Sequence, residues 1–312
     1  MFSRKFFSLD DLTNLPKPQW LIEGLFEVNS LVMLYGPPAS YKSFLVLDWV
    51  LSMATARKWH NHPTIPSKVL YVLGEGKSSL LKRVETWIHY YNVGAEERDT
   101  LNQNFRVTFD VPQFASKASV DNLLAGLEAD GFKPDVIVVD TFARSFVGMD
   151  ENSQKDTGLW VESADRMRQL GYTVIFLHHT AKNTEFGLKY RGSTAIMGAM
   201  DTAFALQKDY QMPSRVILTC TKQKDHDEGD PTYFQRLIVT PNPREEGSII
   251  LVPTVKMDDR FTPEYQKAGE IMESLIADPT FTDDTGRAEK LAALTGMTLG
   301  AAKTRLSRRR KG

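Results

Sequence analysis

The sequence contains little cysteine and no long apolar run. Its one cysteine among 312 residues, Cys220, excludes an internal disulfide framework and a cysteine cluster for zinc, because both need several thiols. No apolar stretch approaches the ~18 residues that a membrane-spanning helix requires. The first residues reach Asp10 and Asp11 without the apolar core of a signal peptide. We therefore expect a cytoplasmic protein that has no membrane partner.

Net charge is also scarce, at -1 for the whole chain, but it is distributed unevenly. Residues 287–312 contain eight basic side chains and a single acidic one, Glu289, so this segment has a net charge of +7 and the remainder has -8. Such an asymmetry favours an anionic partner for the basic segment. A solvated basic end that only increases solubility is the alternative interpretation.

Apolar runs follow one another along the chain, separated by amphipathic segments. Continuous apolar strands that alternate with helices are typical of a parallel sheet covered on both faces. After Gly192 the strands become shorter, which predicts an antiparallel extension of this sheet. The predicted strands are residues 31–35, 68–73, 136–139, 173–177, 215–219 and 234–239, and the first predicted helix is residues 43–51.

The domain organisation follows from composition and from one turn-rich segment. With 42% hydrophobic and 25% charged residues, the chain can bury one sizeable core and a small appendage. Residues 258–263 are typical of a linker, and the sequence from Glu264 onward has a helical pattern. We expect an α/β domain at residues 1–257 and a small helical domain at residues 258–312.

A phosphate-binding loop is predicted between the first strand and the first helix. The segment Gly36–Ser43 fits the motif in its length, its first glycine and its final Lys42-Ser43. Backbone N–H groups cradle the phosphates in such a loop, the lysine neutralises their oxygens and the serine hydroxyl ligates Mg²⁺. The predicted ligands are therefore ATP and Mg²⁺. The nucleotide-binding set is Gly36, Pro37, Pro38, Ala39, Ser40, Tyr41, Lys42, Ser43 and Phe44.

Tyr41 stands where this motif normally has its second glycine. That glycine allows a positive φ, which a bulky residue reaches only with strain, so we expect an atypical loop conformation. A chance Gly-Pro-Pro turn before Lys-Ser is the competing interpretation. The position of Asp140 argues against a chance turn, because this residue ends a buried strand, where the magnesium-directing carboxylate of such a site belongs.

Hydrolysis of ATP also requires a residue that positions the attacking water. Glu75 lies between two glycines at the end of the second apolar strand, and we predict that it has this role; a solvated turn residue is the alternative. His178 and His179 end the fourth strand at the same edge of the sheet. We predict that His179 senses the γ-phosphate, although a hydrogen-bonded histidine at a strand end would give the same pattern.

These motifs in this order resemble the RecA-like family of hexameric replicative helicases, typified by the plasmid RepA helicase and its phage relatives. The resemblance implies a RecA-like P-loop fold, a homo-oligomeric ring of six subunits and a nucleotide site between neighbouring subunits. The segments that support it are Trp20–Gly24, Gly36–Ser43, Tyr71–Gly76, Val138–Thr141, Asp150–Asn152, His178-His179, Arg191–Ser193 and Asp201.

The same resemblance implies roles for several basic residues. Lys222 and Lys224 occupy the place of cations that complete the site of the neighbouring subunit, and Arg191 is a second candidate. A lysine there would contribute a non-bidentate charge. The loops at residues 144–155 and 182–191 resemble those that face single-stranded DNA, with phosphate contacts predicted from Arg144, Lys182 and Lys189 and base stacking from Phe146, Phe186 and Tyr190.

The basic C-terminal segment has the outline of a helix-turn-helix. Residues 288–294 and 299–310 are predicted helices, separated by a turn at Thr295-Gly296. We expect Ala301, Ala302 and Leu306 to face inward. The side chains expected to face outward toward nucleic acid, including duplex DNA, include Lys303, Arg305, Arg308 and Arg309.

Three functions remain open at this point. The first is an ATP-dependent DNA helicase or translocase of phage or plasmid replication, which would act in the host cytoplasm if phage-encoded. The second is a RecA-like recombination or annealing ATPase that assembles on DNA without unwinding it. The third is a nucleotide-switched loader or regulator whose basic end recognises duplex DNA.

Overall fold

The computed structural model describes residues 6–14, 17–150, 153–180, 194–209, 212–242, 246–255, 263–278, 280, 283–295 and 299–311. The chain divides into two compact units. The larger unit comprises Met1–Lys208 and Ser214–Thr254, and the smaller unit comprises Asp209–Pro213 and Val255–Gly312. No helix among the described residues is long and apolar enough to cross a membrane.

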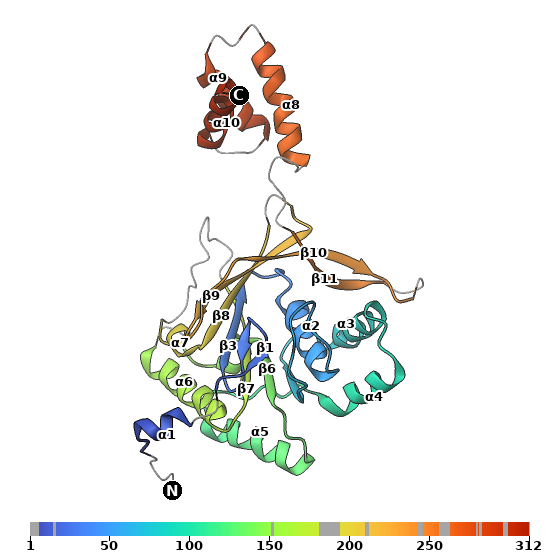
Figure 1. Cartoon of the computed structure of the whole chain (residues 1–312), viewed down its shortest axis with the longest axis vertical. Coiled ribbons are helices and arrows are strands. Elements are labelled where there is room, and N and C mark those ends of the chain that lie inside the picture. Colours follow the sequence, from blue (N-terminus) through green and yellow to red (C-terminus); the bar gives the residue numbers. More distant parts are fainter. Residues whose placement is uncertain are drawn as a thin grey trace. The chain divides into compact units, whose positions relative to one another are not determined.

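A nine-stranded sheet forms the centre of the larger unit (Figure 1). Its strand order is β11-β10-β9-β8-β3-β7-β6-β4-β5. The six strands from β8 to β5 run parallel, and β9, β10 and β11 continue the sheet antiparallel. The strands are β3 (Leu31–Gly36), β4 (Val69–Leu73), β5 (Phe105–Thr108), β6 (Val136–Asp140), β7 (Thr173–His179), β8 (Thr202–Lys208), β9 (Arg215–Gln223), β10 (Thr232–Val239) and β11 (Ser248–Thr254).

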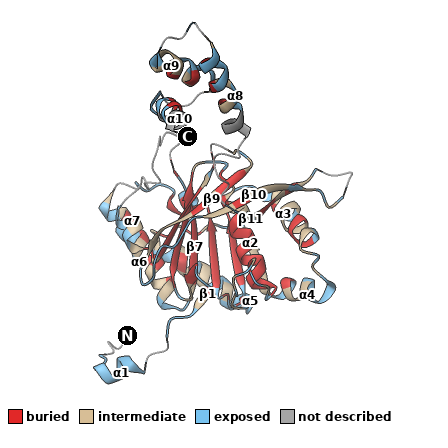
Figure 2. Ribbon diagram, turned by 45° about the horizontal axis from the view of Figure 1, so that its top comes forward, coloured by how far each residue is buried: buried red, intermediate tan, exposed pale blue. Residues whose placement is uncertain are grey.

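Helices cover both faces of this sheet, because its central strands are apolar on both sides (Figures 1 and 2). One face packs against α2, α3 and α4, and the other packs against α5, α6 and α7. A separate two-stranded sheet and the exposed helix α1 precede β3. The elements are α1 (Leu9–Thr13), β1 (Trp20–Ile22), β2 (Phe26–Glu27), α2 (Lys42–Ala54), α3 (Lys77–Tyr90), α4 (Ala95–Asn104), α5 (Lys117–Asp130), η1 (Phe142–Phe146), α6 (Gln154–Gln169) and α7 (Thr194–Ala199).

A buried carboxylate fixes α2 against its neighbours. Asp48 is 4% exposed and accepts hydrogen bonds from the indole Nε1 atoms of Trp59 (2.7 Å) and Trp87 (2.6 Å). Because buried polar groups are costly unless they are hydrogen-bonded, these two donors make the acid tolerable in the core. The helix that begins at Lys42 is therefore held rigidly between the sheet and α3.

The smaller unit contains three helices with a core of their own. α8 (Pro263–Ala277), α9 (Asp284–Thr295) and α10 (Leu299–Lys311) enclose a short set of apolar side chains. Ala302 and Leu306 face inward as expected, whereas Arg305 does not face outward freely: it is half-buried, and its guanidinium lies against Gly269 of α8. The core consists of Met272, Leu275, Ala288, Leu291, Ala302 and Leu306.

The predicted mixed α/β class, with a mostly parallel sheet and an antiparallel extension, is confirmed. All six predicted strands are present, with ends shifted by a few residues, and the first helix is longer than predicted, at Lys42–Ala54. Strands β5, β8 and β11 were not predicted. β5 is short and β8 contains small and polar residues, so their hydrophobic pattern is weak. β11 contains the apolar run at residues 249–252 and could have been predicted from it.

Candidate functional site

The predicted phosphate loop, Asp140 and His179 meet at the carboxyl edge of the parallel strands. Gly36 at the end of β3 is paired with His179 of β7, and Asp140 at the end of β6 is paired with Leu177 of the same strand. The register of three neighbouring strands therefore brings the phosphate loop, an acid and a histidine together. Ligands of open α/β sheets lie at this edge.

The loop from Gly36 to Tyr41 has an unusual backbone. A Cβ on Gly36 would collide with the carbonyl oxygen of Leu206 in β8, so only glycine fits there. Ala39 has a φ of 59° and Tyr41 a φ of 71°, both in the left-handed region. The structure thus has Tyr41 in the conformation that the glycine of the motif would adopt, and α2 begins directly after it.

The ammonium group of Lys42 points back into this loop. Its Nζ donates to the carbonyl oxygens of Gly36 and Pro37, both at 2.9 Å, and lies 3.2 Å from Nδ1 of His179. The side chain is 4% exposed, and burial lowers its pKa to about 8, while the negative charge of Asp140 opposes that shift. A lysine in this place can neutralise phosphate oxygens that approach the loop.

Asp140 and Ser43 form a pair of oxygen donors beside Lys42. Asp140 is 3% exposed and accepts a 2.9 Å hydrogen bond from the hydroxyl of Tyr71. Burial raises the pKa of Asp140, while hydrogen bonds from Ser43 and Tyr71 oppose this rise. Mg²⁺ prefers oxygen ligands and often takes only one or two from the protein in nucleotide sites. The donor set therefore fits Mg²⁺, with Ser43 and Asp140 as the groups that would hold it.

Glu75 forms an ion pair at the rim of this site. Its Oε1 lies 3.2 Å from Nε of Arg144, and both side chains are about half exposed. Burial is the main cause that raises the pKa of Asp140 and lowers the pKa of His179. The negative charge of Glu75 adds to the first shift and opposes the second. Arg144 was predicted to contact DNA; the structure gives it this ionic partner within the same chain.

The two histidines differ in environment. His178 is buried and packs against Phe142, with 4.9 Å between the ring centroids. His179 is more exposed, and burial together with the nearby charge of Lys42 lowers its pKa. A neutral imidazole is favoured by that shift, and its Nδ1 can accept a hydrogen bond from the lysine. His179 is therefore the histidine that the structure brings to the loop.

Lys222 and Lys224 lie away from the phosphate loop. Lys222 of β9 pairs with Ala203 of β8, and Ala203 in turn pairs with Met33 in the middle of β3. Its Nζ donates to the carbonyl oxygens of Met197 (3.0 Å) and Gly198 (2.8 Å). Lys224 forms a 3.3 Å ion pair with Asp201, at the end of the sheet opposite the loop. The structure thus does not bring these lysines to the site of their own chain.

Several predicted DNA contacts lie outside the described residues. This group comprises Lys182, Lys189 and Arg191, together with the aromatic residues Phe186 and Tyr190. The side chains of Arg308 and Arg309 are likewise not described, whereas Lys303 is exposed on α10. The prediction that Phe146 stacks on bases is wrong. It is 4% exposed and stacks on Phe142 instead, because η1 turns its aromatic side into the core.

Three cations near the loop were not predicted from the sequence. Arg83 of α3 lies over the ring of Phe44, and its positive charge opposes the rise that burial causes in the pKa of Asp140. Lys208 and Arg236 both lie against the ring of Tyr41, at 5.0 and 5.8 Å from its centroid. No motif indicated them, since they come from a helix face and from strands that are far apart in the sequence.

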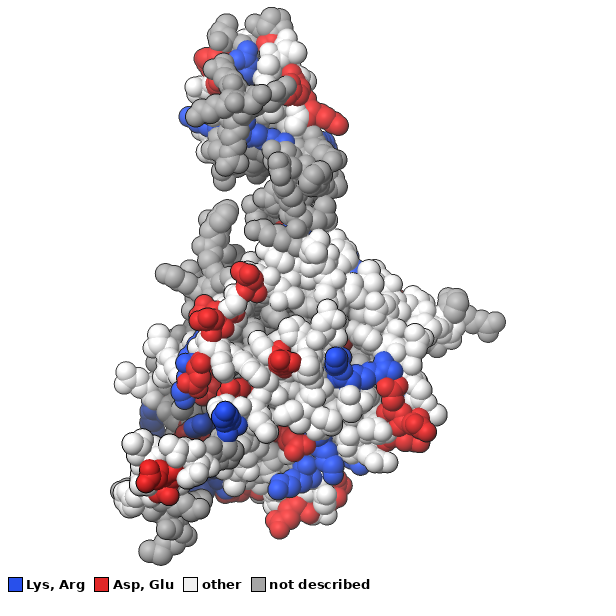
Figure 3. Space-filling model, viewed as in Figure 1, with Lys and Arg blue, Asp and Glu red and all other residues white. Residues whose placement is uncertain are grey.

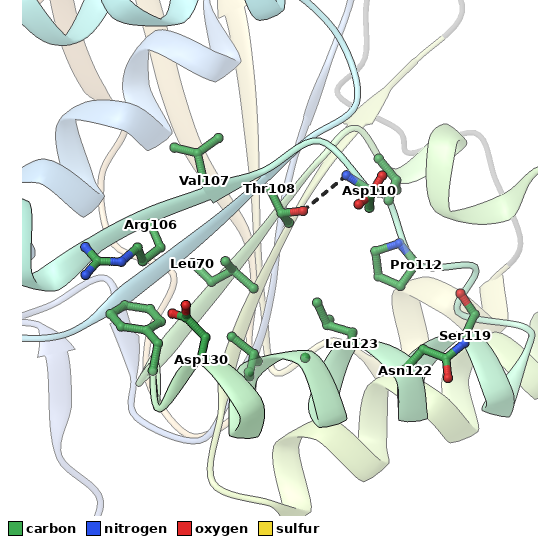
Figure 4. A pocket seen from close by; sticks show the side chains of 14 residues that line it. Leu70, Arg106, Val107, Thr108, Asp110, Pro112, Ser119, Asn122, Leu123 and Asp130 are labelled. Carbon is green, nitrogen blue, oxygen red and sulfur yellow. Dashed lines mark hydrogen bonds between the residues drawn. The ribbon is translucent and has the colours of Figure 1, made fainter.

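The larger unit also has a pocket of about 490 Å³ between β5 and α5 (Figure 4). Leu70 and Leu123 line it together with Arg106 and Asp130, and no predicted site residue is among its lining. On the face seen in Figure 3, basic and acidic side chains of the larger unit are interspersed. The pocket thus lies apart from the phosphate loop and the residues around it.

A family model described as an AAA domain matches residues 3–185. That region contains the phosphate loop, Glu75, Asp140 and His179, and it spans more than half of the 312 residues. No curated protein matches the chain.

Proposed function

The chain belongs to the AAA domain family and is a P-loop ATPase, and from this premise we propose that it is an oligomeric DNA translocase of the RecA-like helicase type. In this proposal the ring of subunits hydrolyses ATP while it moves on single-stranded DNA during phage or plasmid replication. The observation that supports it best is the separation of the Lys42 site from Lys222 and Lys224. If Lys222 and Lys224 take part in phosphoryl transfer, as the resemblance implies, only a neighbouring subunit can bring them to the loop.

The chemistry at the loop follows from the described contacts. The N-terminus of α2 and the ammonium of Lys42 stabilise the phosphate charge. When bound, Mg²⁺ on Ser43 and Asp140 neutralises charge on the phosphate oxygens. Glu75 orients the attacking water once its carboxylate is released from Arg144. His179, at 3.2 Å from the lysine, is placed to respond to the γ-phosphate.

In this proposal Lys222 and Lys224 act at the loop of a neighbouring subunit. They lie two residues apart and are bound to groups of the Asp201 region, where the parallel strands begin. Two subunits arranged head to tail would bring this region of one chain to the loop of the next. Such an arrangement makes hydrolysis depend on assembly, as a translocating ring requires.

The DNA contacts in this proposal rest on charge and exposure. Arg144 is 55% exposed beside Glu75, so DNA phosphates that attract it would free the catalytic carboxylate. Lys303 is an exposed cation on α10 of the smaller unit. Phosphate neutralisation by such residues makes binding dependent on salt. The helix-turn-helix role of α9 and α10 belongs to the same proposal.

Strand displacement on a forked DNA duplex tests the proposal. We expect ATP-dependent release of one strand by the full chain and none by Lys42→Ala, with closed rings visible in electron micrographs. Filaments that anneal or exchange strands without unwinding would instead indicate a recombination ATPase. Duplex binding switched by ATP, without movement or rings, would indicate a loader or regulator.

A further inference from the structure

Tyr41 is an unexpected residue at the most constrained position of the phosphate loop. It begins α2 in the left-handed region, with φ 71° and ψ 21°. A bulky side chain persists there only when its surroundings determine the conformation. Its own carbonyl oxygen accepts from the N–H groups of Phe44 and Leu45, so the first turn of α2 depends on its orientation.

Two cations, one from β10 and one from β8, hold the tyrosine. Arg236 of β10 donates from Nη1 to the phenol oxygen at 2.8 Å, and its guanidinium carbon is 5.8 Å from the ring centroid. Lys208, the last residue of β8, has its Nζ 5.0 Å from the same centroid. Both distances lie within the range of a cation–π interaction. The ring is thus fixed by its hydroxyl and by both charges.

The position of Arg236 is itself rigid. Its backbone pairs with Leu251 of β11, and its N–H donates to the carbonyl oxygen of Ser214. Among the described residues no carboxylate forms an ion pair with Arg236, and its Nε has no hydrogen-bond partner. Its contacts with Tyr41 are therefore the main polar contacts of this guanidinium, which argues against a role in a separate structural ion pair.

We propose that Arg236 is a positioning residue that holds Tyr41, and through it the phosphate loop, in the conformation that binds nucleotide. The contacts of the tyrosine side chain stabilise the positive φ that a glycine would adopt without them. Lys208 supports the ring from β8. The antiparallel strand β10 and the parallel strand β8, whose Leu206 meets Gly36, thereby control the affinity for ATP. This inference depends on the proposed nucleotide site at Lys42.

The proposal makes the effect of Arg236 conditional on Tyr41. Arg236→Met in the full chain should weaken binding of a fluorescent ATP analogue about tenfold, the effect of ~1.4 kcal/mol of coupling. In a chain that already has Tyr41→Gly the same substitution should change the dissociation constant less than twofold, because glycine adopts the loop conformation unaided. Tyr41→Phe keeps the ring but loses the hydroxyl, and it should weaken binding about threefold.

Arg106→Met is the matched control. Arg106 also lies over an aromatic ring, that of Phe132 at 5.2 Å, but it is remote from the loop and should leave nucleotide affinity unchanged. Equal losses from Arg236→Met in both backgrounds would overturn the proposal and indicate a direct contact with nucleotide. No loss in either background would also overturn it.

Two further results separate the possible failures. If Arg236→Met does not fold by thermal melting, unchanged affinity of Tyr41→Phe would still contradict the proposal. If the unaltered chain binds ATP no better than Lys42→Ala, the nucleotide site itself is wrong, and the failure does not concern Arg236.

Discussion

The phosphate loop and α10 differ in how far their basic side chains are buried. Lys42 is 4% exposed and has defined partners at 2.9 to 3.4 Å, and burial lowers its pKa. Lys303 of α10 is exposed, in a helix of strongly polar composition. A buried cation acts on a ligand group at one defined position, whereas exposed cations act through their summed charge and are screened by salt. A buried cation is therefore suited to catalysis, and exposed cations are suited to binding a polyanion.

Glu75→Gln tests the catalytic chemistry at the phosphate loop, and we expect it to have the largest effect of the substitutions that follow. Loss of the carboxylate that positions water should lower ATP turnover about 10²- to 10³-fold, while nucleotide affinity stays near that of the unaltered chain. Turnover can be measured as phosphate release. Glu85→Gln is the control, since Glu85 is also an exposed glutamate paired with an arginine, at 2.7 Å from Arg98. Turnover within twofold of normal would remove Glu75 from the mechanism.

Lys222→Ala and Lys224→Ala should act between subunits. We expect each to lower turnover about tenfold or more, because a transition-state charge loses a cation. Mixing the double variant with Lys42→Ala should restore part of the turnover, since each chain then supplies what its neighbour lacks. Mixtures that remain as inactive as the separate variants would show that these lysines do not act in trans.

Charge removal on α10 should affect DNA binding and leave basal ATP turnover intact. Replacing Lys303, Arg308 and Arg309 by glutamine should reduce the slope of log affinity against log salt by about 2 on single-stranded DNA, at ~0.7 per phosphate contact. Lys117→Gln, an exposed lysine of α5, is the control. An unchanged slope would mean that α10 is not a DNA contact.

The pH dependence of ATP binding should reveal the protonation of Lys42. Its pKa in the folded chain is about 8, compared with 10.5 in the unfolded chain. The buried charge therefore disfavours the folded state below pH 8, and this penalty is relieved as pH rises from 8 to 10.5. Between these values ATP binding should take up a proton, and affinity should fall up to about tenfold per pH unit. Calorimetry in two buffers of different ionisation enthalpy measures this uptake, which Lys42→Ala should abolish.

The strands that position the site could be predicted because their signals are local. Uninterrupted apolar runs ended by a glycine, an acid or a histidine indicated β3, β6 and β7, and neighbouring strand ends had to meet at one edge. The motif also singled out Tyr41, but an atypical loop was expected there, whereas Tyr41 adopts the positive φ of the motif's glycine. Each of these conclusions depended on a few consecutive residues.

What could not be predicted depends on contacts between distant residues. Arg236 lies 195 positions from Tyr41 in the sequence, and Arg144 lies 69 positions from Glu75. The resemblance and the residue type made Phe146 a stacking platform. The turn at η1 directs this phenylalanine into the core instead, and it brings Arg144 to an acid that the sequence did not pair with it.

ATP turnover by the full chain and by Lys42→Ala, with and without single-stranded DNA, tests the nucleotide site and its coupling to DNA most directly. We expect that the unaltered chain hydrolyses ATP faster when DNA is added. Lys42→Ala, with its fold confirmed by thermal melting, should hydrolyse essentially none in either condition, because the phosphates lose their buried counterion. Similar turnover by both chains would contradict the assignment of Lys42 to the nucleotide site.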